Sequence, residues 1–280
     1  LDFQLEEILV SSGAKQSCYN ACQALLQAGD EVIIPAPYWV SYPDMVRLTN
    51  AEPVIIHATA DRSYRISPEQ LQAAITEQTR ALIINSPCNP TGAAYARAEW
   101  LALGEVLREH PRIFVITDDI YEHIHWADKP FCSLLTACPN LRERVLTVNG
   151  VSKCYAMTGW RVGWMIGPAD LVRAAGNLQS HATSNVSNVS QRAALVLKGA
   201  YSVPFGHLVR ADSDICHDSL NGGWPAQAVG NFCSFIPGPA DGTDVCFDHQ
   251  FHKGLEIGSR RPSELLSGLA SVSNEEVDLS

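Results

Sequence analysis

Long apolar runs, an excess of basic residues and closely paired cysteines are all missing from this 280-residue sequence. No apolar run approaches the length that crosses a membrane, and no signal peptide is visible. Acidic residues outnumber basic ones and give a formal net charge of −10, which leaves no basic face for nucleic acid. We therefore expect a cytoplasmic location, with a plastid as the alternative, and neither a membrane nor a nucleic acid as partner.

The nine cysteines are unevenly spaced and form no Cys-x-x-Cys motif. Cys18 and Cys22 lie four residues apart in a predicted helix, which more often indicates two packed side chains than a metal site. His123 and His125 follow two aspartates, but a solvent-facing pair after a strand is the simpler interpretation. We expect buried free thiols in a reducing compartment and no metal centre.

An initiating methionine is also missing, because the sequence begins with Leu1 and enters predicted structure almost at once. This indicates a fragment of a longer protein. The length suits one large domain with a sizeable core. Periodic patterns end at about Gly199, so we predict a large domain over residues 1–200 and a divergent C-terminal region over residues 201–280. That region is either a remnant of a small domain or the product of a shifted reading frame.

Short apolar runs alternate with helical patterns over the first 200 residues. The predicted strands are Ile8–Ser11, Glu31–Ile34, Val54–His57, Ala81–Asn85, Ile113–Thr117, Val145–Val148 and Val162–Ile166. Ser12 is predicted to cap a helix that runs to about Gln27. Ser67, with Gln70 in capping-box position, caps another, and a third covers Arg97–Glu109. This alternation indicates an α/β fold with a mostly parallel sheet covered by helices on both faces.

Polar residues collect where these predicted strands end. Ligands of such sheets bind beyond the carboxyl ends of the strands, so Gly13, Asn89, Asp118 and Lys153 are expected to lie close together. The amine of Lys153 can form a Schiff base if its neighbours and partial burial lower its pKa. Arg161, in the same loop, is placed to hold a phosphate through paired, charge-assisted hydrogen bonds.

Each of these signals has a simpler interpretation when it is taken alone. A helix that starts at Gly13 offers free N–H groups to an anion, but many helices start this way. Trp39 near a strand end is usually a core residue. Asn89 before a proline is usually part of a turn, and Asp118 at a strand end is most simply a cap.

Three strings of residues are more specific than these single signals. Residues 152–163, Ser-Lys-x-x-x-Met-Thr-Gly-Trp-Arg-x-Gly, resemble the lysine loop of class I aminotransferases, which are pyridoxal-phosphate enzymes of fold type I. Residues 37–43, Pro-Tyr-Trp-Val-Ser-Tyr-Pro, and residues 85–92, Asn-Ser-Pro-Cys-Asn-Pro-Thr-Gly, resemble further motifs of that family. The resemblance covers roughly residues 5–198 and is closest to the aspartate and prephenate aminotransferases.

The resemblance implies a role for each matching residue. Lys153 holds pyridoxal 5′-phosphate as a Schiff base and then serves as general base and acid at the substrate α-carbon. Asp118 pairs with the protonated pyridine nitrogen, while Tyr121 and Asn89 hydrogen-bond the phenolic oxygen. Trp39 stacks on the ring. Amino-group transfer between an amino acid and a 2-oxo acid, in a homodimer, is the implied activity.

Two further groups of residues follow from the same resemblance. Those implied to hold the cofactor phosphate are Gly13, Ala14, Lys15, Ser152 and Arg161. Those implied to contact the substrate are Lys15, Trp39 and Asn89. A lysine at position 15 favours a dicarboxylic substrate such as aspartate, glutamate or prephenate.

Two features of the family have no match in the sequence. The N-terminal segment of the family lies upstream of Leu1, and no C-terminal arginine stands in the context that pairs with the substrate α-carboxylate. Three alternatives therefore stay open. The first is that the chain is another pyridoxal-phosphate enzyme, such as a carbon–sulfur lyase or decarboxylating synthase. The second is that it is a non-catalytic aminotransferase-like regulatory domain, and the third is that it is an inert fragment.

Overall fold

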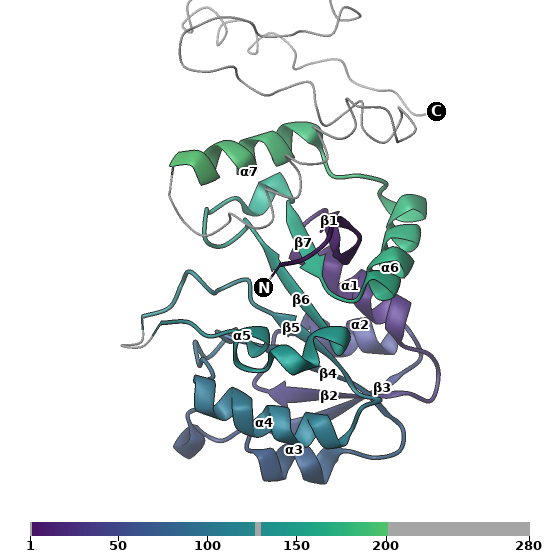
Figure 1. Ribbon diagram of the computed structural model, residues 1–280, viewed down its shortest axis with the longest axis vertical. Helices are drawn as coiled ribbons and strands as arrows, with labels where there is room; N and C mark the ends of the chain where they lie inside the picture. Colours follow the sequence, from purple (N-terminus) through teal and green to yellow (C-terminus); the bar gives the residue numbers. More distant parts are fainter. Residues whose placement is uncertain (1, 127–129, 201–280) are drawn as a thin grey trace, which may run out of the picture. The chain divides into compact units, whose positions relative to one another are not determined.

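A seven-stranded sheet, in the order β1-β7-β6-β5-β4-β2-β3, lies at the centre of the computed structural model, which describes residues 2–126 and 130–200 (Figure 1). The strands are β1 (Ile8–Ser11), β2 (Glu31–Ala36), β3 (Glu52–His57), β4 (Thr79–Asn85), β5 (Phe114–Asp118), β6 (Val145–Gly150) and β7 (Gly163–Ile166). Strand β7 runs antiparallel to both of its neighbours, and the other adjacent pairs are parallel. The predicted mostly parallel α/β fold is therefore confirmed. The C-terminal region over 201–280 lies outside the described residues, so the division at residue 200 stays a prediction.

Helices connect most of these strands. They are α1 (Ala14–Leu25), α2 (Ser41–Arg47), α3 (Pro68–Ala74), α4 (Arg97–Glu109), α5 (Leu134–Ala137), α6 (Ala169–Ala182) and α7 (Asn188–Ala200). Short 3-10 turns are η1 (Leu5–Glu7), η2 (Ala60–Arg62), η3 (Pro139–Arg144) and η4 (Thr158–Trp160). None of the helices in the described part of the chain is long and apolar enough to cross a membrane.

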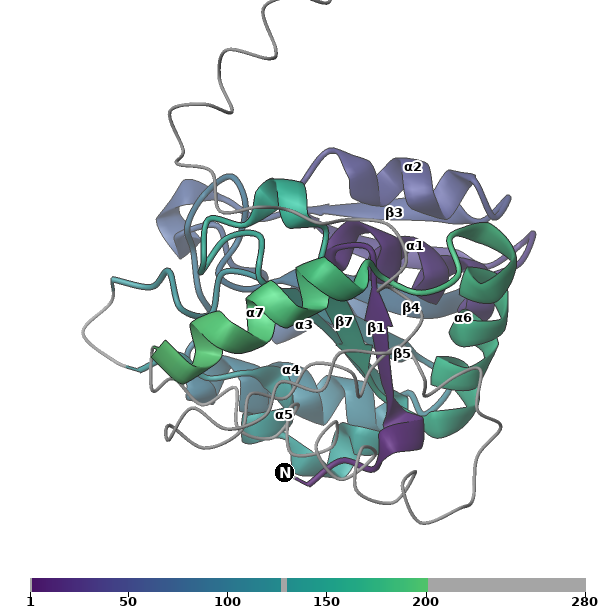
Figure 2. The same ribbon diagram turned by 90° about the horizontal axis from the view of Figure 1, so that it is seen from above.

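Successive residues of the central strands face opposite layers of helices. Val32 and Ile34 of β2 are buried with residues of α1, α2 and α6, whereas Ile33 between them is buried with residues of α3, α4 and α5. This is the period of two that a pleated strand imposes on its side chains. Figures 1 and 2 show the two layers on opposite sides of the sheet. The sheet is thus covered on both faces, as the continuous apolar strands predict.

A third apolar cluster surrounds the antiparallel strand β7. Trp164 of β7 packs with Val151, Met157 and Val162 of the loop before it, and with Ala194 of α7. This cluster holds both ends of the loop between β6 and β7. The loop carries Lys153 and Arg161, so its packing fixes where two of the predicted site residues lie.

Local sequence signals predicted most element positions, with exceptions at the start of α1 and at the helices α5, α6 and α7. Helix α4 has the predicted bounds, and the capping box of Ser67 and Gln70 at α3 is confirmed. Ser12 does not cap α1, because the N-cap is Gly13, which has no side chain to accept a hydrogen bond. The N–H of Ser12 instead binds the Gln16 side chain at 2.6 Å. Helices α6 and α7 follow the last predicted strand and were not identified from sequence.

Candidate functional site

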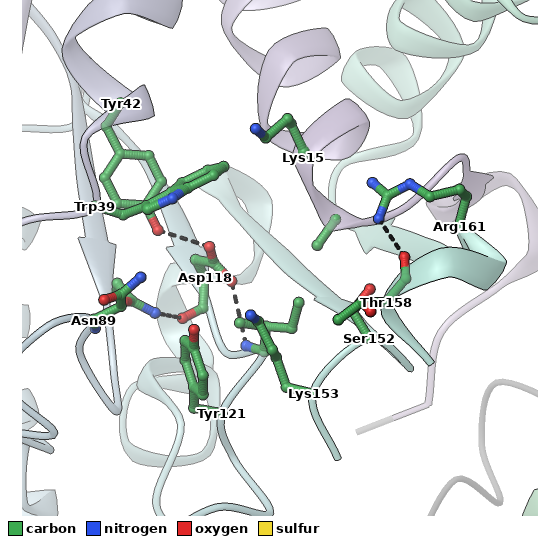
Figure 3. A pocket seen from close by; sticks show the side chains of 13 residues that line it. Lys15, Trp39, Tyr42, Asn89, Asp118, Tyr121, Ser152, Lys153, Thr158 and Arg161 are labelled. Carbon is green, nitrogen blue, oxygen red and sulfur yellow. Dashed lines mark hydrogen bonds between the residues drawn. The ribbon is translucent and has the colours of Figure 1, made fainter. Parts of the chain in front are cut away.

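The ends of strands from both halves of the sheet meet at one edge. Gly150, the last residue of β6, pairs with Gly163, the first residue of β7, and Gly163 pairs in turn with Ser11, the last residue of β1. At β4 and β5 the paired last residues are Asn85 and Asp118. A cavity opens at this edge (Figure 3). Its lining consists of Ala14, Lys15, Trp39, Tyr42, Asn85, Asn89, Asp118, Ile120, Tyr121, Ser152, Lys153, Thr158 and Arg161.

All of the predicted site residues except Gly13 line this strand-end cavity. Gly13 lies directly behind it, since a Cβ atom built on Gly13 would stand 2.3 Å from an Arg161 guanidinium nitrogen. Gly13 also has φ of 89°, a conformation that favours glycine. The structure therefore brings the whole predicted set together, although the role of each residue stays a prediction.

One side of the cavity is cationic. The Arg161 guanidinium donates hydrogen bonds to the backbone carbonyls of Thr158, at 2.8 Å, and Ser12, at 3.2 Å. These bonds hold Arg161 beside the start of α1, where the first N–H groups have no partner within the helix and the helix dipole is positive. Lys15 lies one residue into the helix and is exposed. This part of the cavity suits a phosphate or another small anion.

The opposite part of the cavity contains a buried carboxylate. One oxygen of Asp118 accepts a hydrogen bond from the Tyr42 hydroxyl at 2.6 Å, and the other accepts from the N–H of Ile120 at 3.3 Å. Burial raises the pKa of Asp118, while these two donors and the charge of Lys153 lower it. Burial and the neighbouring Asp118 raise the pKa of Tyr42 well above its usual range. The tyrosine therefore keeps its proton and acts as the donor.

Aromatic and amide groups connect these two parts. The Asn85 side chain donates to the Asp118 carbonyl at 2.6 Å and accepts the N–H of Asn89 at 2.7 Å, which ties the loop after β4 to the end of β5. The amine of Lys15 lies 4.9 Å from the centre of the Trp39 ring, a cation–π contact.

Lys153 faces the same space from the loop after β6. Its amine lies 5.6 Å from the centre of the Tyr121 ring. The partial burial expected of Lys153 is not observed, because the residue is exposed at the cavity. A small molecule in the cavity can therefore reach this amine directly.

Two more carboxyl groups, those of Asp119 and Glu122, follow Asp118 along the chain. Burial, together with Glu122 and Asp118, raises the pKa of Asp119 well above its usual range. Glu122 accepts a hydrogen bond from Asn149 at 2.8 Å and lies 3.3 Å from a ring nitrogen of His123. No group of three or more His, Cys, Asp or Glu within residues 2–126 and 130–200 is placed to hold a metal ion.

Four residues of the cavity were assigned no role from the sequence: Tyr42, Asn85, Ile120 and Thr158. Tyr42, Asn85 and Thr158 lie inside strings that the sequence had already singled out, and Ile120 lies between Asp118 and Tyr121. Tyr42 follows Trp39 by three residues, which is one helical turn at the start of α2. Nothing local indicated that it reaches Asp118, which is 76 residues away along the chain.

The donor set defines the chemistry that this cavity accommodates. Lys15, Lys153 and Arg161 supply three cations, and Asp118 is the one carboxylate in the lining. The arrangement fits a flat molecule that has an anionic group at one end and a protonatable ring nitrogen at the other. An amine that can react with a carbonyl group, Lys153, stands between them.

Comparison with known sequences places this arrangement in a family. The family model described as aminotransferase class I and II matches residues 1–200. The chain is 48% identical over 224 residues to the aspartate/prephenate aminotransferase of Nitrosomonas europaea, which covers 79% of this chain and 56% of that protein. It is 52% identical over 195 residues to the protein of the same name from Cereibacter sphaeroides, and this match covers 70% of this chain and 49% of that protein. The chain thus spans about half the length of the curated relatives it matches.

Solved structures agree with these sequence matches. The aspartate aminotransferase of Rhizobium meliloti superposes with a TM-score of 0.70 at 44% identity, covering 79% of this chain and 56% of that one. The Thermus thermophilus aspartate aminotransferase with maleate gives a TM-score of 0.66 at 36% identity, and this match covers 77% of this chain and 57% of that one.

Proposed function

Because the chain belongs to the class I and II aminotransferases, we propose that it transfers an amino group between an amino acid and a 2-oxo acid. The observation that carries this proposal is the position of Lys153 and Asp118. A reactive amine and a buried carboxylate line one cavity whose remaining charged groups are cations. General acid–base chemistry on an amino acid bound to a cofactor needs both groups.

Aminotransferases of this type use pyridoxal 5′-phosphate, and the cavity fits that molecule. When bound, the cofactor supplies an electron sink for the charge that develops at the substrate α-carbon. Asp118 pairs with the pyridine nitrogen and keeps it protonated. The start of α1 at Gly13 and Ala14, together with Ser152 and Arg161, holds the phosphate.

The remaining residues of the cavity orient the ring and move protons. Lys153 would hold the cofactor through Nζ, and the same amine, when free, would accept the proton of the substrate α-carbon as general base and return it as general acid. Tyr121 and Asn89 donate hydrogen bonds to the phenolic oxygen. Trp39 packs against the ring face and fixes its plane.

Lys15 supports a dicarboxylic substrate. Its amine is exposed at the cavity beside Trp39, where it can pair with the side-chain carboxylate of aspartate, glutamate or prephenate. The same proposal includes a homodimer and a cytoplasmic location, both of which are typical of the family to which the chain belongs.

The test is to reduce the purified chain with borohydride in the presence of pyridoxal 5′-phosphate and to map the labelled peptide. We expect the cofactor on Lys153, and no label at that peptide in Lys153→Ala. Lys15→Ala is the matched control, because it removes the other lysine of the cavity and should leave the label in place. A label that persists at comparable yield in Lys153→Ala would show that another residue carries the cofactor.

A second assay separates transamination from its alternatives. With aspartate and 2-oxoglutarate, transamination yields a new amino acid and a new oxo acid in equal amounts. A lyase would release ammonia instead, and a decarboxylating enzyme would release carbon dioxide. A regulatory domain or an inert fragment would give no product even when the cofactor is attached.

A further inference from the structure

The hydroxyl of Tyr42 makes the shortest contact to the buried carboxylate of the cavity. Its oxygen lies 2.6 Å from Asp118, and Tyr42 is only 2% exposed. Tyr42 is carried by helix α2, and its ring also packs edge-on against the ring of Trp39. The two ring centroids lie 5.3 Å apart and the ring planes are inclined at 84°. A buried, fixed hydroxyl cannot turn to water, so its hydrogen bond to Asp118 persists.

The surroundings of Asp118 leave the hydroxyl of Tyr42 as its strongest neutral donor. Helix α1 contributes the buried thiol of Cys18, and β5 is followed by the buried carboxyl of Asp119. The loop after β6 contributes Lys153, and the Ile120 N–H donates at the longer distance of 3.3 Å. The Asn85 amide binds the backbone carbonyl of Asp118 and not its carboxylate. Burial thus opposes ionisation of Asp118, while the Tyr42 hydrogen bond, the Ile120 N–H and the charge of Lys153 favour it.

We propose that Tyr42 is a positioning residue that keeps the Asp118 carboxylate ionised and oriented, and thereby sets how strongly this cavity binds a protonated ring nitrogen. The inference rests on the proposed function for the identity of the ligand. Its first part concerns Asp118 alone and holds with or without a ligand. A hydrogen bond to the charged form of an acid favours that form, and removing the bond favours the neutral acid. A neutral Asp118 loses its charge-assisted bond to the ring nitrogen.

The first experiment follows the carboxyl of Asp118 without any ligand. The chain is labelled with carboxyl-¹³C aspartate, the Asp118 signal is assigned by its absence from Asp118→Asn, and the pH is titrated by NMR. In Tyr42→Phe the midpoint of Asp118 should move to higher pH. The matched control is Tyr95→Phe, which removes another buried tyrosine hydroxyl, one that accepts a hydrogen bond from the N–H of Ile66 at 3.0 Å. An unchanged midpoint in Tyr42→Phe overturns the proposal.

A second form of the variant guards against a failure to fold. Replacing Tyr42 by a fluorinated tyrosine keeps the ring and the hydroxyl but makes the hydroxyl a stronger donor. The Asp118 midpoint should then move to lower pH, opposite to the direction in Tyr42→Phe. Movement in the same direction for both variants would mean that packing, and not the hydrogen bond, controls Asp118.

The final experiment measures ligand affinity by equilibrium dialysis. Tyr42→Phe should bind pyridoxal 5′-phosphate about tenfold more weakly, which corresponds to about 1.4 kcal/mol. An analogue with a CH group in place of the ring nitrogen cannot pair with Asp118, so its affinity should change by less than about twofold. Equal weakening for both ligands would reduce Tyr42 to a packing role and overturn the proposal. If the parent chain binds neither ligand, the proposed function fails, while the NMR titration still decides the role of Tyr42.

Discussion

At the scale of single residues, burial and neighbouring charges compete to set the pKa values of three carboxyl groups at the end of β5 and just after it. Asp118, Asp119 and Glu122 lie within five residues of one another, and burial raises the pKa of each. Hydrogen-bond donors partly offset this effect of burial in all three: Tyr42 and Ile120 for Asp118, Thr117 for Asp119, and Asn149 for Glu122. Asp119 is the least compensated, because Glu122 and Asp118 both raise its pKa further.

This imbalance predicts a pH dependence of stability. An acid whose pKa is raised in the folded state contributes stability below its unfolded pKa, and this contribution is lost as the pH rises through its folded pKa. Asp119→Asn removes that loss, so the variant should be more stable than the parent at neutral pH, by on the order of 1 kcal/mol. Denaturant unfolding at about pH 5 and about pH 8 measures the difference. The control Asp170→Asn, at an exposed position, keeps Asp119 and should follow the pH profile of the parent. An identical profile for parent and Asp119→Asn would refute the prediction.

At the scale of elements, the site depends on how closely β6, β7 and the start of α1 approach one another. The first residue of β7, Gly163, lies against the start of α1, and a Cβ atom on Gly163 would stand 2.3 Å from the N of Ala14 and 2.5 Å from the carbonyl carbon of Gly13. Gly150 at the end of β6 is also confined, though less tightly, since its Cβ would lie 2.9 Å from the Val162 carbonyl oxygen. These contacts involve backbone atoms, which cannot turn away as a flexible side chain does.

Gly163→Ala should therefore push the start of α1 away from Arg161. We expect a loss of about 1–3 kcal/mol in the free energy of unfolding and weaker binding of pyridoxal 5′-phosphate, because the anion-binding N–H groups move. Gly159→Ala is the control in the same loop, since a Cβ atom there meets nothing within 4 Å. Denaturant unfolding and dialysis measure the two effects. Equal behaviour of the two variants would argue against a tight approach of β7 to α1.

At the scale of the whole molecule, the cavity joins segments that are distant in the sequence. Its lining comes from the start of α1, the segment between β2 and α2, α2 itself, the ends of β4 and β5 with the residues that follow them, and the loop between β6 and β7. A ligand that contacts all of these segments binds the folded chain and not the unfolded one. Binding should therefore stabilise the described domain as a unit.

We expect free pyridoxal 5′-phosphate at about 100 times its dissociation constant to stabilise the fold by about 2.7 kcal/mol. Thermal melting of the chain with and without the cofactor measures this gain. Pyridoxal without its phosphate, at the same concentration, should stabilise less, because it leaves Arg161 and the start of α1 without a ligand. Equal stabilisation by the two compounds would mean that the phosphate is not held where we propose.

The sequence by itself determined the fold class and most of the elements. Alternating patterns of apolar residues and caps such as that at Ser67 are local signals, and they gave α4 with its observed bounds. Strings such as residues 85–92 and 152–163 identified the candidate site and the family, since their residue order is specific. The prediction that Ser12 caps α1 was wrong, because the preference of serine for the N-cap position is only a local signal. The helix has Gly13 as its N-cap, and the N–H of Ser12 binds the Gln16 side chain.

Only the tertiary structure decided which groups meet. The hydrogen bond from Tyr42 to Asp118 joins residues 76 apart, and the bond from Arg161 to the Ser12 carbonyl joins residues 149 apart. The close approach of Gly163 to Ala14 is likewise set by the register of β1, β7 and β6. No local pattern records such contacts, because they follow from the packing of whole elements. The sequence therefore named the residues of the site, while the packing of the sheet and its helices set their distances, their burial and the charge that each one faces.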